Sequence, residues 1–174
     1  IYPPTLQPLI DKNIPVIIKN TFDKEAGGTL INDKGNPKGD GSIVKGISHI
    51  YDVVLISLAG SGMICIPGFS KRFFECLSQK HINIIMITQA SSEHSICIGV
   101  RSEDAALAKK TIDNHFAFEI SVQKVTAAKI ESNMSNIAVV GDRMKDHQGI
   151  SGKLFSSLGA NNVNIRAIAQ GASE

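Results

Sequence analysis

The apolar residues between positions 53 and 81 follow first the pattern of a strand and then the spacing of a helix. Val53–Gly60 (VVLISLAG) is a nearly continuous apolar run, which predicts a buried strand. A glycine-rich turn follows and ends at Gly68. From Gly68 to His81, apolar side chains recur at helical intervals, which predicts a helix. The side chains expected on its inner face are Phe69, Phe73, Phe74 and Leu77.

The alternation of strand and helix patterns continues to residue 125. Asn83–Ala90 (NIIMITQA) and His94–Val100 (HSICIGV) predict two strands, and residues 90–93 predict the tight turn between them. Glu103–Phe116 predicts a second helix, and Ala117–Val125 predicts a last strand. The residues expected on the inner face of this helix are Ala106, Leu107, Ile112 and Phe116. The order βαββαβ predicts an α+β fold, the ferredoxin-like sandwich, with its helices on one face of a four-stranded sheet.

The chain also repeats itself at a fixed interval. Gln89 and Gln170 end two similar apolar stretches, and the shift that brings one glutamine onto the other aligns the residues before them without a gap. The matched pairs include Gly60 and Gly141, Met63 and Met144, Gly68 and Gly149, Ser70 and Ser151, Phe74 and Phe155, Leu77 and Leu158, and Asn83 and Asn164. Chance rarely produces such agreement, so we infer an internal duplication and expect tandem ferredoxin-like domains. The spacing from Gln89 to Gln170 is called the repeat interval below.

The second copy is shorter than the first. Ile137–Gly141 predicts its first strand, residues 149–161 its first helix, and Val163–Gln170 its second strand. Ile150, Leu154, Phe155 and Leu158 are expected to point inward from the helix. The third strand, second helix and fourth strand are missing, so we expect a truncated copy. We also expect a strand near Val44–Ile50 to be lent to this copy, that is, to join its sheet.

The first residues read as the end of another domain. Thr5–Asn13 predicts a short helix and Ile14–Thr21 a largely buried strand. Gly, Asn, Asp, Pro and Lys dominate from Ile31 to Ser42, which predicts a surface linker. The expected division is therefore 1–31, a linker at 32–43, a first repeat at 44–130 with its core at 53–125, and an incomplete second repeat at 131–174.

Composition narrows the class of function. The net charge of +2 comes from interspersed charges, so the basic stripe of a nucleic-acid binder is missing. No apolar run approaches the roughly 20 residues of a membrane helix, and we expect a cytoplasmic protein without nucleic-acid or membrane partners. An RNA-binding module of the same βαββαβ order needs aromatic residues on its central strands, whereas the phenylalanines here fall on helices.

The usual catalytic patterns are missing as well. Gly60 and Gly62 stand between a strand and a helix, but a P-loop needs G-K-[ST], and Cys65 stands where a dinucleotide fingerprint needs its third glycine. There is no G-x-S-x-G elbow, and the cysteines and histidines show no metal-ligand spacing. We therefore expect no catalytic residue, no metal and no cofactor in this chain.

Gln89 is the polar end of an otherwise apolar strand, and two interpretations compete for it. Its amide either satisfies backbone groups at the strand end, or it faces a ligand beside the glycine turn. The N–H groups at the helix start near Pro67, Gly68 and Phe69 favour an anion such as a carboxylate. The counterpart Gln170 favours the second interpretation, because both glutamines end matching strands beside matching glycine turns. A pocket of this kind suits a free amino acid.

These motifs resemble a known family. IPVIIKNTFDKEAGGTLI (14–31) resembles the segment that closes the kinase domain of aspartate kinases, an amino-acid-kinase α/β domain. Residues 60–100, from GSGMICIPGF to HSICIGV, resemble their first ACT domain, and residues 139–174, from VVGDRMKDHQ to AIAQGASE, resemble their second. QASSEHSI and AIAQGASE look most like the bifunctional aspartokinase and homoserine dehydrogenase type.

The resemblance implies the regulatory region of an enzyme that phosphorylates aspartate with ATP and magnesium, both used by a kinase domain that is absent here. It implies a homodimer through paired ACT domains and an amino-acid effector that inhibits by feedback. Carried over, the effector contacts are Met63, Ile66, Gly68, Phe69, Ser70, Asn83, Ile84 and Gln89, with Asn164 and Gln170 in the second copy.

The residues also bear on which amino acid is the effector. Lysine-regulated relatives have an acidic side chain near the start of the second strand, where this chain has apolar Ile85. An unpaired buried ammonium would cost on the order of several kcal/mol, so threonine is the expected effector. Methionine, lysine or a synergistic pair stay open, as does a purely structural dimerisation module that binds nothing.

Overall fold

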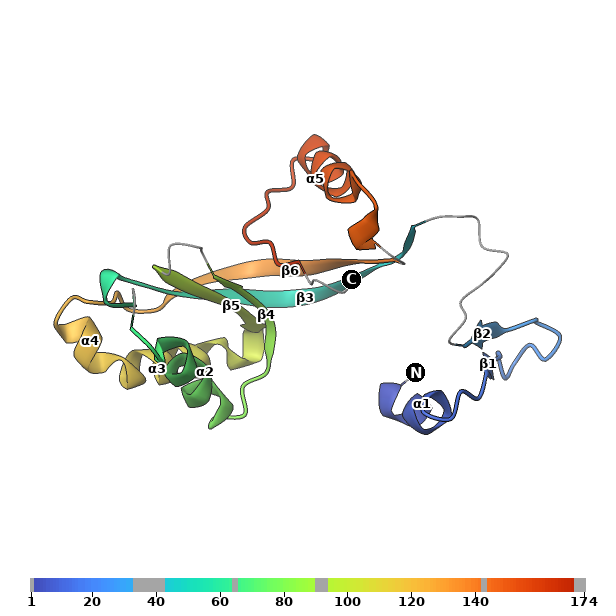
Figure 1. Ribbon diagram of the computed structural model, residues 1–174, viewed down its shortest axis with the longest axis horizontal. Helices are drawn as coiled ribbons and strands as arrows, with labels where there is room; N and C mark the ends of the chain where they lie inside the picture. The colour runs from blue at the N-terminus through green and yellow to red at the C-terminus, as the bar shows by residue number, and fades with distance from the viewer. Residues whose placement is uncertain (1, 33–42, 64–65, 90–93, 142–143, 171–174) are drawn as a thin grey trace. The chain divides into compact units, whose positions relative to one another are not determined.

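The computed structural model describes residues 2–32, 43–63, 66–89, 94–141 and 144–170, and the predicted turn at 90–93 lies outside them. The chain forms two compact units, Ile1–Ser42 and Ile43–Glu174 (Figure 1). Most of the predicted linker, residues 33–42, is not described. Among the described residues, no helix is both long and apolar enough to cross a membrane.

The first unit contains a helix and a two-stranded hairpin. Helix α1 (Pro3–Ile10) begins with prolines, whose fixed φ suits a first helical turn. Strands β1 (Val16–Ile18) and β2 (Thr29–Ile31) pair antiparallel. The prediction of a largely buried strand here was wrong, because Ile17 is 60% exposed. A hairpin with one short helix offers too little apolar surface to cover it within this unit.

The second unit is built on a four-stranded antiparallel sheet of order β4-β5-β3-β6. Its strands are β3 (Val44–Ala59), β4 (Ile84–Gln89), β5 (Ser95–Arg101) and β6 (Lys129–Gly141). Its helices are η1 (Ser61–Met63), α2 (Phe69–Ser78), α3 (Ser102–His115), α4 (Ala117–Ser121), η2 (Met144–Asp146) and α5 (Ile150–Ala160). Helices α2 and α3 lie together on one face of the sheet (Figure 1).

The core lies between this sheet face and the two helices. Alternate residues of β3 and β5 point into it, among them Ile56 and Ile98, which are fully buried and directly opposite each other. Phe73 of α2 and Ile112 of α3 close the core from the helix side, both with no exposed surface. The ferredoxin-like fold predicted from the sequence is therefore confirmed for the first copy.

Two of the four residues predicted on the inner face of α3, Ile112 and Phe116, are buried, and the other two are not. Ala105, Ala108, Ile112 and the following Phe116 are buried, whereas Leu107 is 46% exposed and Ala106 is exposed as well. The observed stripe follows intervals of three and four residues without a break. Ala106 and Leu107 lie outside this stripe.

The predicted last strand, Ala117–Val125, was wrong. Residues 117–121 form α4, and the amide N–H groups of Lys124 and Val125 both donate to the Glu119 carbonyl. An alternating pattern alone does not determine a strand, because tertiary contacts also decide the structure. Here those contacts include the hydrogen bond from Arg72 of α2 to the Glu119 side chain. The fourth strand is β6, which begins at Lys129.

Strands β3 and β6 serve both copies. Ile56 of β3 pairs with Ile130 of β6 in the first copy, and His49 of β3 pairs with Ile137 of β6 in the second. Ile137 corresponds to Ile56 and Ile130 to His49 at the repeat interval, so the two strands exchange roles between the copies. Val44–Ile50 therefore occupies the fourth-strand place of the second copy, as predicted for the lent strand. Residues 44–50, which we had assigned to the first repeat, pair with Asn136–Gly141 of the second.

The duplication is also visible in the backbone. Residues with positive φ recur at the repeat interval: Asp52 (54°) and Asn133 (62°), Gly68 (84°) and Gly149 (84°), His81 (56°) and Asn162 (57°). Positive φ is uncommon outside glycine. Its repetition at three matched places shows that both copies make the same turns.

The second copy is less complete than the first in its core and in its sheet. The predicted inner residues of α5 are half-buried, and no residue of that helix is buried. Residues 163–170 were predicted to be a strand, but they pair with no strand in the described chain. A strand needs a neighbour for its backbone groups, and no third strand of this copy is present among the described residues.

Candidate functional site

The turn after β3 is packed tightly against the segment that follows α4. The Gly62 N–H donates to the Lys124 carbonyl at 2.8 Å, and the Gly60 N–H donates to the His94 carbonyl at 2.9 Å. A Cβ atom on Gly60 would lie 2.3 Å from the Lys124 carbonyl oxygen, so a larger residue does not fit. Glycine is required here by close backbone approach rather than by an unusual φ.

The start of helix α2 offers free backbone donors. Gly68 precedes it with φ 84°, and no side chain caps this end. The Phe69 N–H donates to the Ile66 carbonyl at 3.3 Å. The next two amides, of Ser70 and Lys71, lie in the first turn, where no intrahelical acceptor exists. This end of α2 can therefore bind a carboxylate.

A cavity of about 200 Å³ lies between this helix start, the turn and the end of β4. Its walls include buried Met63, Phe69 and Ile96, and Gln89 also lines it. The described residues that line it are Met63, Ile66, Gly68, Phe69, Ser70, Lys71, Gln89 and Ile96. The cavity is smaller than a typical drug site, and it combines apolar walls with an amide, a hydroxyl and free N–H groups, which suits a small polar metabolite.

The structure brings six of the ten predicted contacts to this cavity. They are Met63, Ile66, Gly68, Phe69, Ser70 and Gln89. Asn83 and Ile84 lie at the opposite end of β4, about 20 Å from Gln89 at the usual rise of a strand. Asn164 and Gln170 are exposed on the unpaired segment of the second copy. Effector contact by any of the ten stays a prediction.

Two lining residues were missed from the sequence. Lys71 follows Ser70 in the first turn of α2, so proximity alone could have found it. Ile96 lies directly opposite Gln89 on the neighbouring strand β5. Only the pairing register, which no local pattern reveals, places Ile96 in the cavity.

The second copy repeats the geometry of the turn. A Cβ atom on Gly141 would lie 2.3 Å from the Ile43 carbonyl oxygen. This is the same distance as that between a Cβ atom on Gly60 and the Lys124 carbonyl oxygen. Ile43 and Lys124 are themselves separated by the repeat interval. Gly149 takes the place of Gly68 before α5. Both copies therefore present a helix start beside a glycine turn.

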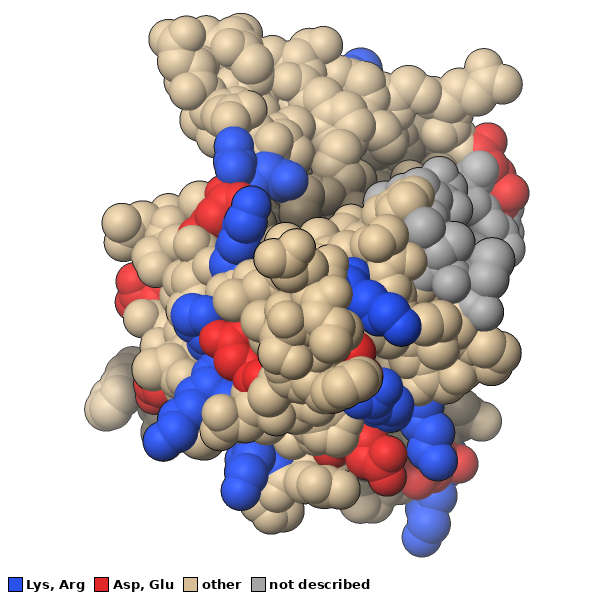
Figure 2. Space-filling model, turned by 90° about the vertical axis from the view of Figure 1, so that its left-hand side faces the viewer, with Lys and Arg blue, Asp and Glu red and all other residues tan. Residues whose placement is uncertain are grey.

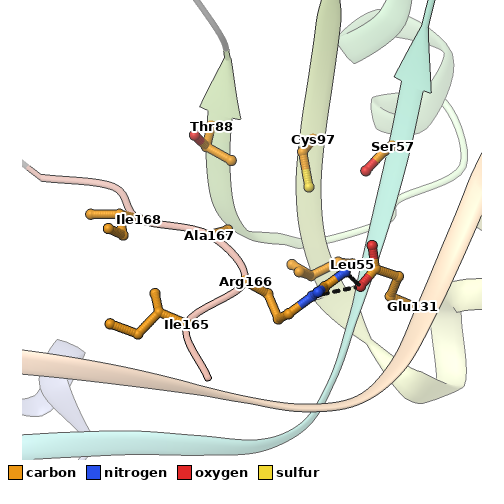
Figure 3. A pocket seen from close by; sticks show the side chains of 9 residues that line it. All are labelled: Leu55, Ser57, Thr88, Cys97, Glu131, Ile165, Arg166, Ala167 and Ile168. Atoms are coloured by element: carbon orange, nitrogen blue, oxygen red, sulfur yellow. Dashed lines mark hydrogen bonds and ion pairs between the residues drawn. The ribbon is translucent and has the colours of Figure 1, made fainter. Parts of the chain in front are cut away.

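A larger cavity of about 430 Å³ lies on the sheet face away from α2 and α3 (Figure 3). Strand side chains Leu55, Ser57, Thr88, Cys97 and Glu131 form one side, and residues 165–168 form the other. Arg166 bridges the two sides, donating from Nε to Glu131 Oε2 at 2.8 Å. The Arg166 and Glu131 side chains are 47% and 43% exposed, so this ion pair holds the segment only weakly. We place the candidate site in the smaller cavity, whose lining includes the core residues Met63, Phe69 and Ile96.

Electrostatic contacts next to the site fix helix α2. Arg72 donates to Glu119 Oε1 at 2.7 Å, and its guanidinium lies 4.9 Å from the centre of the Phe116 ring. This hydrogen bond lowers the pKa of Glu119 below its ordinary value, although partial burial acts in the opposite direction. Burial raises the pKa of the Cys76 thiol, which stays protonated and packs in the core.

The described residues show no metal-binding group of three or more His, Cys, Asp or Glu side chains. Figure 2 shows Lys and Arg side chains interspersed with Asp and Glu on the face turned to the viewer. That face therefore presents no broad patch of a single sign.

Fold and site together define a duplicated ferredoxin-like α+β domain with a small cavity at its first helix start. The family model of the ACT domain matches residues 56–116 and 137–174, more than half of the chain and once in each copy. The chain belongs to the ACT domain family.

The relatives are aspartate kinases. A bifunctional aspartokinase/homoserine dehydrogenase of Haemophilus influenzae is 39% identical over all of this chain, which spans 21% of that protein. Lysine-sensitive aspartokinase 3 of Escherichia coli is 26% identical over 99% of this chain and 37% of its own length. The crystal structure of Clostridium acetobutylicum aspartate kinase matches 97% of this chain and 38% of its own, with a TM-score of 0.81 at 26% identity. The family predicted from the sequence is confirmed.

Proposed function

We propose that this chain is the regulatory region of an aspartate kinase and that its first ACT copy binds an amino-acid effector, threonine. The observation that carries the proposal is the cavity of about 200 Å³ that Gln89 lines together with the start of α2. The catalytic activity, with its ATP and magnesium, resides in other parts of a protein of which this chain represents about a fifth, by comparison with its bifunctional relative.

Threonine matches the cavity group by group. Its carboxylate is held by the free N–H groups of Ser70 and Lys71 at the positive end of the helix. The Gln89 amide supplies both a donor and an acceptor, for the hydroxyl and the ammonium. The methyl group contacts Met63 and Ile96.

Two observations favour threonine over lysine. Among the described residues that line the cavity none is acidic, so they offer no carboxylate to the distant ammonium of lysine. The chain is also more similar to the bifunctional relative, at 39% identity, than to the lysine-sensitive one, at 26%. Methionine lacks the hydroxyl that would use the second hydrogen-bonding group of Gln89.

Inhibition follows from differential binding. In a homodimer joined through paired ACT domains, threonine binds one arrangement more tightly than the other and so favours an inactive kinase. Couplings of this kind are typically about 1–3 kcal/mol. A module that only holds the dimer together has no such preference and no ligand.

A thermal scan with each aspartate-family amino acid tests this proposal. Threonine at 100 times its dissociation constant should stabilise the chain by about 2.7 kcal/mol and raise its melting temperature. Gln89→Ala should abolish this shift and leave the ligand-free melting temperature nearly unchanged, because Gln89 is exposed. Gln79→Ala, at the exposed end of α2, is the matched control and should keep the shift.

A shift with lysine and none with threonine would reject the effector assignment. No shift with any amino acid, repeated on the full-length protein, would favour the purely structural role.

A further inference from the structure

Lys71 lines the proposed effector cavity and carries an exposed, charged side chain. Among the described residues that line it, Lys71 is charged and none is acidic. The start of α2 adds the positive end of a helix dipole on the same side. The cavity therefore attracts carboxylates and repels cationic groups.

The second copy lacks this charge. Gly152 takes the place of Lys71 after a shift by the repeat interval, and a Cβ atom there would meet nothing within 4 Å. The backbone before each helix is the same, with φ and ψ of 84° and 1° at Gly68 and 84° and −2° at Gly149. The turns before the two helices also differ in charge, since Ser61, Gly62, Ile64 and Cys65 correspond to Asp142, Arg143, Lys145 and Asp146. Lys71 is the difference that falls in the helix start itself.

We propose that Lys71 is a specificity-determining residue, which excludes effectors that carry a second ammonium and admits those with a neutral side chain. The inference rests on the proposed function, in which this cavity binds a free amino acid. A diamino acid that places its carboxylate at the helix start would bring its distal ammonium into a cavity that already holds a positive charge and, among its described lining residues, no carboxylate. Repulsion of the wrong ligand then supplements attraction of the right one.

The test compares lysine with norleucine, which has the same carbon chain but no distal ammonium. Dissociation constants are measured by calorimetry for the full chain, for Lys71→Met and for Lys71→Glu, with threonine as reference. At contact distance in water one charge pair changes affinity about fivefold. The ratio of the lysine to the norleucine constant should therefore fall about fivefold in Lys71→Met and about twentyfold or more in Lys71→Glu.

Lys80→Glu is the matched control for net charge. Lys80 lies nine residues further along, about 14 Å at the rise of a helix, and this exceeds the screening length of about 8 Å at physiological salt. The ratio of the lysine to the norleucine dissociation constant should be the same in Lys80→Glu as in the unchanged chain. The fold is not at risk in Lys71→Glu, because an acidic residue in the first turn of a helix is favourable.

Each result decides between the proposals. An unchanged ratio in Lys71→Glu, with threonine still bound by the unchanged chain, would overturn the role of Lys71 alone. Binding of threonine without measurable binding of norleucine or lysine to any variant would also overturn it, since size rather than charge would then exclude lysine. Failure of threonine and norleucine to bind the unchanged chain would instead reject the proposed function.

Discussion

At the scale of single residues, two kinds of constraint shape the site. Gly60 and Gly141 are required because a backbone carbonyl lies where their Cβ atoms would be. Gly68 and Gly149 are required for another reason, their positive φ, although the space beside them is open. Neither requirement is visible in the residue type alone, since a glycine turn reads the same in both cases.

Gly60→Ala should destabilise the second unit by about 1–3 kcal/mol, because the new methyl group meets backbone that cannot move aside cheaply. Gly152→Ala, in open space within α5, should instead stabilise the chain by roughly 0.5–1 kcal/mol. Urea unfolding of both variants checks the pair. Equal effects of the same sign would contradict the close approach at Gly60.

At the scale of elements, α4 replaces a predicted strand and joins two walls of the cavity. The Glu119 side chain of α4 accepts a hydrogen bond from Arg72 in α2. After α4, the backbone carbonyl of Lys124 accepts a hydrogen bond from the Gly62 N–H of the glycine turn. The segment 119–124 therefore holds the helix start and the turn in one geometry. This arrangement explains why an alternating sequence is not a strand here.

The Arg72–Glu119 pair should make stability depend on acid pH. The folded protein lowers the pKa of Glu119 below its ordinary 4.5, so the pair contributes stability above about pH 4.5. That contribution is lost as the pH falls through the lower folded pKa. The Arg72 side chain is 43% exposed, so we expect less than about 1 kcal/mol.

Urea unfolding of Glu119→Gln between pH 3 and 7 measures this contribution. The variant should be less stable than the unchanged chain at pH 7 and approach it in acid. Glu75→Gln, on the exposed side of α2, removes the same charge as a control. A difference from the unchanged chain that persists at the lowest pH would contradict the assignment.

At the scale of the whole molecule, the second unit contains two copies that share their longest strands. The second copy takes its fourth strand, Val44–Ile50, from the chain that precedes the first copy. The segment that joins the two units therefore leads directly into the sheet of the second copy. The two copies cannot be separated by cutting the chain between residues 130 and 131 without breaking β6.

Truncation tests this sharing. A chain that starts at Ile43 should keep its amide protection, whereas one that starts at Asp52 should lose protection at Ile137–Gly141, whose partners are gone. Lys129–Glu131 should stay protected in both, because they pair with Leu55–Ser57. Hydrogen exchange read by mass spectrometry measures these segments. Equal protection of Ile137–Gly141 in the two chains would contradict the register.

Local patterns determined much of this protein. The order of strands and helices through residue 116 and the internal repeat follow from local patterns, because strand, turn and helix start are adjacent along the chain. The resemblance to the ACT domains of aspartate kinases supplied six of the cavity residues. The predicted relation of Gln89 to the glycine turn rested on the same adjacency and on its repetition at Gln170.

Tertiary structure alone decided the features that depend on distant partners. The contacts of α4 include the hydrogen bond from Arg72 to Glu119, 47 residues apart in sequence, which the local pattern of Ala117–Ser121 does not report. Strand pairing brought Ile96 into the cavity, and it left Asn83 at the far end of β4. The pairing of Val44–Ile50 with Asn136–Gly141 joins segments that the whole first copy separates in sequence. Hydrophobic periodicity reports which side of an element is buried, but not what covers it, and only the folded chain supplies that partner.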